Sequence, residues 1–210
     1  MTSGPGNLNI PTRISRTDIP DTWAWMRADL LVRIAPFTLA YTAVYVITSR
    51  PAWLGLSLGD PAAQLLFAAT AAPVMFVAAA AMQLWLTRRR RALSVPSGPR
   101  DAWFQAAFYL VNGPVEEAFF RGLLQGGLGV KLGAAVGIAI ATTIYVLYHR
   151  LGRWDWPDTL ATALVGIPLG LAFWLLPGPP SLLGVSIAHV AATCGFLGPG
   201  PYFLRKLNLL

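Results

Sequence analysis

The stretch Asn112-Gly-Pro-Val-Glu-Glu-Ala-Phe-Phe-Arg121 places two adjacent carboxylates and an arginine inside a long apolar segment. Glu116 and Glu117 are the only glutamates in the chain. In a helix, Glu117 and Arg121 stand four residues apart on one face, in the favourable order for an ion pair, whereas Glu116 points about 100° away from them. The pattern therefore predicts that Arg121 holds Glu117 while Glu116 is left free.

The composition around this stretch is typical of a membrane protein. Of the 210 residues, 55% are hydrophobic and only 12% are charged, and several apolar runs approach the roughly 20 residues that cross a bilayer as a helix. Ionisable side chains at such a depth are costly, so the glutamates form a candidate functional site. The net charge of +7 includes Arg88–Arg91 beside an apolar run, which indicates an anchor at the membrane surface and no nucleic-acid partner.

Six apolar segments predict an all-α fold, a polytopic membrane helix bundle of about six spans. Gly113 and Pro114 are expected to interrupt the third span just before the glutamates, since broken helices are tolerated in a membrane where they line a cavity. The approximate bounds of the six segments are 30–47, 62–86, 102–124, 132–148, 159–176 and 181–196.

Stretches rich in turn-forming residues divide the bundle into parts. Residues 1–29 are expected to form a cytoplasmic tail with a candidate interfacial helix near its end, and residues 30–91 a two-span N-terminal part. A linker rich in proline and glycine follows. Residues 101–197 then form a core that contains the rare polar residues, and residues 198–210 a cytoplasmic C-terminal tail.

The distribution of lysine and arginine predicts the orientation of the chain in the membrane. With six spans, thirteen of the sixteen basic residues fall on one side, among them Arg88–Arg91, Arg205 and Lys206. Short loops rich in basic residues remain in the cytoplasm. Both termini are therefore expected to be cytoplasmic.

The only two histidines, His149 and His189, lie at the end of the fourth apolar segment and within the sixth. In hydrocarbon each histidine and each glutamate needs a polar partner, and the nearest candidates are one another. We therefore expect one shared polar site built from the third, fourth and sixth segments.

Three chemistries fit this set of residues. A glutamate and a histidine can activate water for hydrolysis of a carbonyl compound, while the other histidine and a nearby hydroxyl stabilise the oxyanion. A metal ion can bind at Glu116, His149 and His189, although the His-Glu-x-x-His spacing of zinc hydrolases is absent. Carboxylate and imidazole groups can also move protons or ions, as in a transporter.

Three short motifs follow one another in the second half of the chain: Glu116-Glu117-Ala-Phe-Phe-Arg121, Tyr145-Val-Leu-Tyr-His149 and His189-Val-Ala-Ala-Thr193. Their order and spacing resemble the motif series of the CAAX prenyl protease and bacteriocin-processing family of intramembrane glutamate proteases. The resemblance covers about residues 101–197. It implies an enzyme that hydrolyses a peptide, with or without a prenyl or other lipid tail, and that needs no metal or other cofactor.

The resemblance also implies roles for individual residues. Glu116 and His149 would activate the water, and His189 would donate to the oxyanion together with the residue four positions later. Glu117 and Arg121 would form the supporting ion pair, in agreement with their spacing on a helix.

Two positions depart from the pattern of this family. Thr193 stands where asparagine is usual, and its shorter side chain can donate one hydrogen bond to an oxyanion. Such a donor contributes about 10²-fold to 10³-fold in rate, so the efficiency of proteolysis depends on this position. Tyr145 replaces the usual phenylalanine and adds a hydroxyl.

Two other functions stay open, namely a membrane enzyme that acts on an isoprenoid or other lipid and a non-catalytic membrane scaffold.

Overall fold

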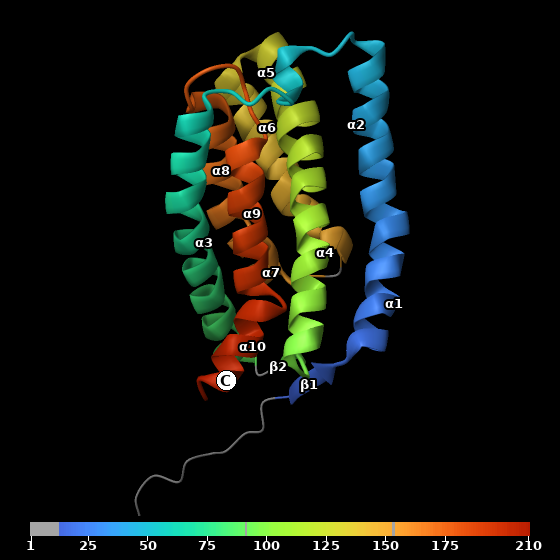
Figure 1. Ribbon diagram of the computed structural model, residues 1–210, viewed down its shortest axis with the longest axis vertical. Coiled ribbons are helices and arrows are strands. Elements are labelled where there is room, and N and C mark those ends of the chain that lie inside the picture. The colour runs from blue at the N-terminus through green and yellow to red at the C-terminus, as the bar shows by residue number, and fades with distance from the viewer. Residues whose placement is uncertain (1–12, 91, 153) are drawn as a thin grey trace, which may run out of the picture.

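The computed structural model describes residues 13–90, 92–152 and 154–210. Its helices stand side by side along the long axis of the molecule, which confirms the predicted all-α helix bundle (Figure 1). At one end of the bundle, β1 (Arg13–Thr17) and β2 (Ala92–Pro96) form a short parallel pair that was not predicted. Residues 1–12 of the predicted tail, and the arginines at 91 and 153 in the charge pattern, lie outside the described residues.

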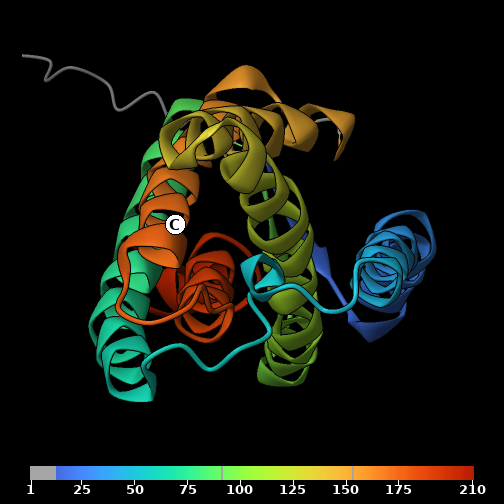
Figure 2. The same ribbon diagram turned by 90° about the horizontal axis from the view of Figure 1, so that it is seen from above.

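The first apolar helix is longer than predicted and runs without a break over Ile19–Ile47. Its start is fixed by Asp18, whose side chain accepts a hydrogen bond from the backbone N–H of Asp21. Figure 2 shows this helix at one edge of the bundle. Its consecutive parts are α1 (Ile19–Asp29), the π-helical η1 (Leu30–Ile34) and α2 (Ala35–Ile47).

The longest helix, α3 (Pro61–Arg90), packs along α9 (Leu183–Phe196). The two backbones come very close at Gly195, where a Cβ atom would lie 2.2 Å from the carbonyl oxygen of Phe76. Glycine therefore permits this contact, as small residues do between membrane helices. A short 3-10 helix, η2 (Ala52–Leu54), precedes α3.

The glutamates lie at the end of α4 (Pro99–Glu117), which continues as the π-helical η3 (Ala118–Gly126) and as α5 (Gly127–Leu132). The predicted interruption near Gly113 and Pro114 is wrong, because α4 is helical through both residues. Proline is tolerated inside a helix that neighbouring helices support, and here Gly113 lies directly against α9. The change of helical geometry follows the glutamates instead, as a π-helical segment of the kind often found at functional sites.

The remaining helices complete the bundle around α4 and α9. They are α6 (Ala134–Tyr148), η4 (His149–Gly152), α7 (Trp156–Ala161), α8 (Ala163–Leu175) and α10 (Pro199–Lys206).

Within the described residues, four helices are long and apolar enough to cross a membrane, or five if the bent pair of α9 and α10 counts as one span. The third predicted span, α4, is not among them. It lies inside the bundle and buries several polar side chains, so its sequence is less apolar than that of the outer helices. The number of six spans stays a prediction.

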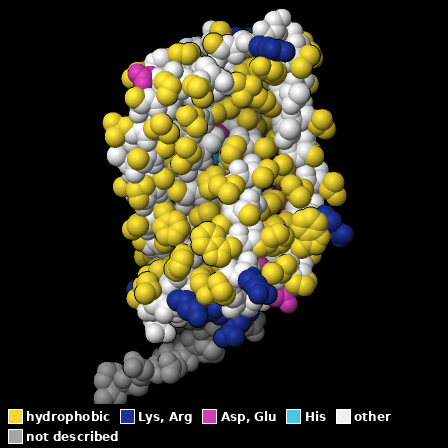
Figure 3. All heavy atoms as spheres, viewed as in Figure 1, with side chains coloured by type: hydrophobic (Ala, Val, Ile, Leu, Met, Phe, Trp, Pro, Cys, Tyr) yellow, Lys and Arg dark blue, Asp and Glu magenta, His cyan; other side chains and the backbone are white. Residues whose placement is uncertain are grey.

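The outer surface of the bundle is strongly apolar. Leu31, Val32 and Leu39 on the N-terminal helix are 70%, 80% and 70% exposed. Figure 3 shows hydrophobic side chains over most of the visible face, with lysine and arginine gathered mainly toward the lower end. Such a continuous apolar surface is typical of a protein surrounded by lipid.

Candidate active site

A cavity of about 1480 Å³ lies inside the bundle, between the N-terminal helix, α3, α4, α6, α8 and α9. It is larger than most small-molecule sites, which range over about 300–1,000 Å³. Figure 3 shows a hollow in the visible face, with acidic and histidine side chains in its depth. The predicted residues that line the cavity are Glu116, Tyr145, His149, His189 and Thr193.

Glu117 is completely buried and is held from two sides. Its Oε2 accepts a hydrogen bond from Arg121 Nε at 3.2 Å, so the predicted i,i+4 ion pair is present. Its Oε1 lies 2.7 Å from His189 Nδ1. Because a buried carboxylate must be paired, these two contacts explain how Glu117 is accommodated among apolar helices.

Glu116 is 2% exposed and also has two partners. Its Oε2 lies 3.4 Å from His189 Nε2, and its Oε1 accepts a hydrogen bond from Arg33 Nη1. The expectation that Glu116 is free of charged partners is therefore wrong. A carboxylate buried at this depth needs counter-charge, and Arg33 supplies it from a helix far away in the sequence.

Arg33 was not among the predicted site residues. It extends from η1 into the cavity, where its guanidinium also pairs with Asp29 one turn earlier. Its position as the lone charged residue in the apolar run Leu30–Ile47 could have marked it as a candidate site residue. Its partner could not be read from the sequence, since Glu116 lies on a separate helix.

His189 lies between the two glutamates, with one ring nitrogen directed at each carboxylate. Its Nδ1 faces Glu117 and its Nε2 faces Glu116 on the side of the cavity. Since a carboxylate accepts hydrogen bonds, both nitrogens of this ring can act as donors when it is protonated.

His149 begins η4 at the end of α6, and its Nδ1 lies 2.8 Å from the backbone oxygen of Tyr145. A carbonyl oxygen can only accept, so we assign the proton of the neutral ring to Nδ1. The Nε2 atom then carries a lone pair. No direct hydrogen bond joins His149 to Glu116 in the described part of the chain, although both line the cavity.

The ring of Tyr145 connects the two histidines. Its centroid lies 4.8 Å from that of His149 and 5.9 Å from that of His189, in edge-to-face arrangements. The Arg121 guanidinium carbon is 4.9 Å from the same ring. Gly166 of α8 packs directly against this ring, since a Cβ there would lie 2.9 Å from Tyr145 Cδ1. The aromatic ring is therefore fixed by α8 and orders the site.

Thr193 lies one turn after His189 on α9 and lines the cavity. Within the described residues its hydroxyl makes no hydrogen bond to another group, so it remains able to donate to a ligand.

Metal ligation was the second chemistry left open by the sequence. Among the residues that the structure describes, no group of three or more His, Cys, Asp or Glu side chains is arranged to hold a metal ion. The carboxylates near His189 are instead paired with arginines.

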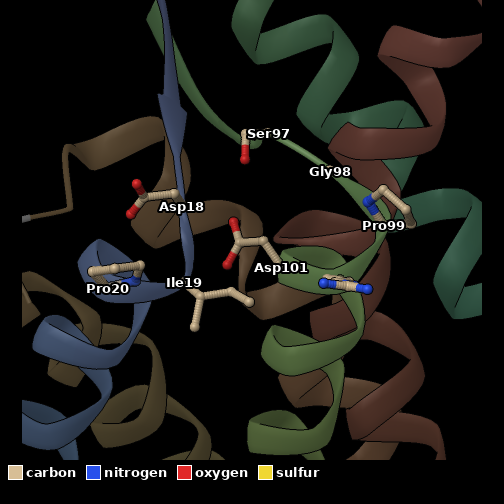
Figure 4. A pocket seen from close by; sticks show the side chains of 8 residues that line it. Asp18, Ile19, Pro20, Ser97, Gly98, Pro99 and Asp101 are labelled. Carbon is tan, nitrogen blue, oxygen red and sulfur yellow. The ribbon is translucent and has the colours of Figure 1, made fainter.

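A second, smaller cavity of about 430 Å³ lies near β1 and the start of α4 (Figure 4). The Asp101 side chain there accepts hydrogen bonds from the hydroxyls of Thr17, at 2.9 Å, and Thr22, at 2.6 Å. These bonds attach the start of the N-terminal helix to α4. The carboxylate is thus used for structure, and none of the predicted site residues lines this cavity.

Comparison with known families agrees with this geometry. Residues 98–194 match the family described as Type II CAAX prenyl endopeptidase Rce1-like. This segment is similar to the Rce1-like family. Nothing among curated proteins or solved structures matches the chain. The Rce1-like segment contains both glutamates, both histidines and Thr193, whereas Arg33 lies outside it.

The similarity of residues 98–194 to the Rce1-like family agrees with the apolar helices of the bundle. Together they support an integral membrane protein of the peptidase class.

Proposed function

We propose that the protein is an intramembrane glutamate-type peptidase that hydrolyses a peptide or lipidated peptide with a water molecule activated by Glu116 and His149. The observation that carries the proposal is the convergence of Glu116, His149 and His189 on one cavity within an apolar bundle. Acid, base and electrostatic groups in a concave apolar site are what general acid–base catalysis requires.

In the proposed reaction, a water held between the Glu116 carboxylate and His149 Nε2 attacks the carbonyl carbon of the scissile peptide bond. Its proton passes to Glu116 as the C–O bond forms. The tetrahedral intermediate then collapses with cleavage of the C–N bond, and the proton goes to the leaving amine. The step is a hydrolysis, so atoms and charge balance without any further reactant.

Glu117, Arg121 and Tyr145 act in this proposal as positioning residues. Glu117 fixes the ring of His189 through its 2.7 Å contact, and Arg121 fixes Glu117. Asp29, Glu116 and Glu117 carry three negative charges, against two positive charges on Arg33 and Arg121. A protonated His189 between the glutamates would make this buried cluster neutral, as a low-dielectric interior favours.

The proposed orientation places both termini and the basic end of the bundle in the cytoplasm. Arg88–Arg90 end α3, and Arg205 and Lys206 end α10, so these basic residues would lie on the cytoplasmic side. The cavity includes Trp25, Val32 and Phe37 of the N-terminal helix, so its apolar wall can accommodate a lipid tail.

The substrate class is tested with purified protein in lipid nanodiscs. Fluorescence-quenched peptides with and without a farnesyl thioether are assayed beside prenyl diphosphates. We expect cleavage of at least one peptide and no turnover of the diphosphates, and full activity after treatment with a chelator. Turnover of a diphosphate alone would favour the lipid-processing enzyme, and loss of activity on chelation would favour the metal-dependent variant.

Arg33→Leu should lower kcat/KM by about 10-fold to 100-fold, because a hydrogen bond to a charged group contributes about 1.5–3 kcal/mol and Glu116 would lose its counter-charge. The matched control is Arg27→Leu, which removes an exposed arginine from the same helix and should leave the rate unchanged. Initial rates on the cleaved peptide provide the measurement. A gain in rate for Arg33→Leu would instead mean that this arginine blocks Glu116.

A further inference from the structure

The side chain of Asn112 has no assigned role, yet it lines the same cavity as Glu116. It is 5% exposed, and its Oδ1 has no hydrogen-bond partner among the described residues. Leaving a buried polar group unpaired costs about 1–3 kcal/mol. An amide that remains unpaired in a cavity wall is therefore a strong candidate for contact with a ligand.

Asn112 lies one helical turn before Glu116 on α4, so the two side chains share a face of that helix and lie about 6 Å apart along its axis. At this level α4 touches α9, since a Cβ on Gly113 would lie 2.7 Å from Val190 Cγ2. Val190 stands between His189 and Thr193 in the sequence. Asn112 therefore lies at the same height along the bundle as His189 and Thr193, the two residues expected to face an oxyanion.

Two of the other donors near Glu116, His189 and Arg33, already contact carboxylates. Both ring nitrogens of His189 are directed at carboxylates. The guanidinium of Arg33 is shared between Asp29 and Glu116. Thr193 offers a single hydroxyl. A carbonyl oxygen that develops negative charge needs more than one donor, and the unpaired amide of Asn112 is available for this.

No hydrogen bond within the described residues fixes which end of the Asn112 amide faces the cavity. Rotation about the terminal torsion exchanges the oxygen and the NH₂ group, and this torsion has a broad energy profile. The NH₂ group can therefore face a ligand without breaking an existing contact.

We propose that Asn112 is a catalytic residue that donates a hydrogen bond from its amide to the carbonyl oxygen of the scissile bond, and that Thr193 is the second donor. The bond strengthens as the oxygen becomes an oxyanion in the tetrahedral intermediate. Asn112 takes no proton from the water and gives none to the leaving amine. This role rests on the proposed peptidase function and adds to it a residue outside the three motifs.

The test compares Asn112→Leu with wild type by kcat and KM on the cleaved peptide, and by affinity for a peptide phosphonate that mimics the tetrahedral intermediate. We expect kcat to fall by about 10²-fold to 10³-fold and phosphonate affinity to fall in parallel, with KM nearly unchanged. The melting temperature should not fall, because the substitution removes an unpaired buried amide. Asn112→Asp, which keeps the shape but loses the donor, should share the loss in kcat.

The matched control is Thr142→Val, which removes another buried polar atom without a partner, on α6 and outside the cavity lining. It should leave kcat unchanged. If the wild type is active and the Asn112→Leu variant keeps the same kcat, or differs only in KM, the role of Asn112 would be overturned and the peptidase proposal would stay intact. A wild type that neither cleaves the peptides nor binds the phosphonate would overturn the peptidase proposal, and the role of Asn112 with it.

Discussion

Glu116→Gln should eliminate most peptide cleavage, with kcat lowered by about 10²-fold to 10⁴-fold, the range that general acid–base catalysis contributes. The amide has nearly the size of the carboxylate, but it cannot accept a proton from water. Initial rates of peptide cleavage in nanodiscs provide the measurement. His149→Asn should give a loss of similar size, because both residues act on the same water in the proposed mechanism.

Asp60→Asn is the matched control for Glu116→Gln. It makes the same change from acid to amide at the start of α3, where Asp60 accepts a hydrogen bond from the Ala63 N–H at 3.0 Å. Asparagine is an equally good helix cap, so both stability and rate should be preserved. Cleavage at the wild-type rate by Glu116→Gln would contradict the proposed role of this residue.

Arg121→Leu should lower the free energy of unfolding by about 3–5 kcal/mol, because removal of one partner leaves the buried Glu117 carboxylate with His189 as its remaining contact. Arg121 and Glu117 are both fully buried, so water cannot replace the lost partner. For a chain of this size such a loss lowers the melting temperature by about 10 °C. Tryptophan fluorescence during heating in detergent measures the change, and Lys131→Leu at an exposed position is the control.

The double variant Arg121→Leu with Glu117→Gln tests whether the lost stability comes from the charge that remains on Glu117 or depends on the contact of Glu117 with His189. If the unpaired charge causes the instability, the second substitution should recover part of it, since a neutral amide is less costly to bury. The amide oxygen introduced at position 117 can still accept a hydrogen bond from His189. A double variant that is less stable than Arg121→Leu alone would mean that the Glu117 contact with His189 dominates instead.

Local patterns in the sequence predicted those features that depend on nearby residues. Each predicted apolar segment contains helix in the structure, since helices in lipid satisfy their backbone groups internally. The Glu117–Arg121 pair followed from a spacing of four on one helix. These are properties of a single element, and they need no knowledge of how elements pack.

The features that were missed depend on packing between elements. Arg33 reaches Glu116 across 83 positions of sequence, and no local pattern records that contact. The bridging of both glutamates by His189 likewise depends on the placement of α9 beside α4. The predicted break at Pro114 was wrong because the surrounding helices support a continuous α4, which the proline rule for isolated helices does not consider.

The measurement that tests the central claim most directly is an experimental structure of the protein with a bound peptide phosphonate. One phosphonate oxygen stands for the attacking water. The proposed mechanism predicts that this oxygen lies about 2.6–3.2 Å from both the Glu116 carboxylate and His149 Nε2. A phosphonate bound in the cavity with either group outside this reach, or with the His149 ring turned toward lipid, would contradict it.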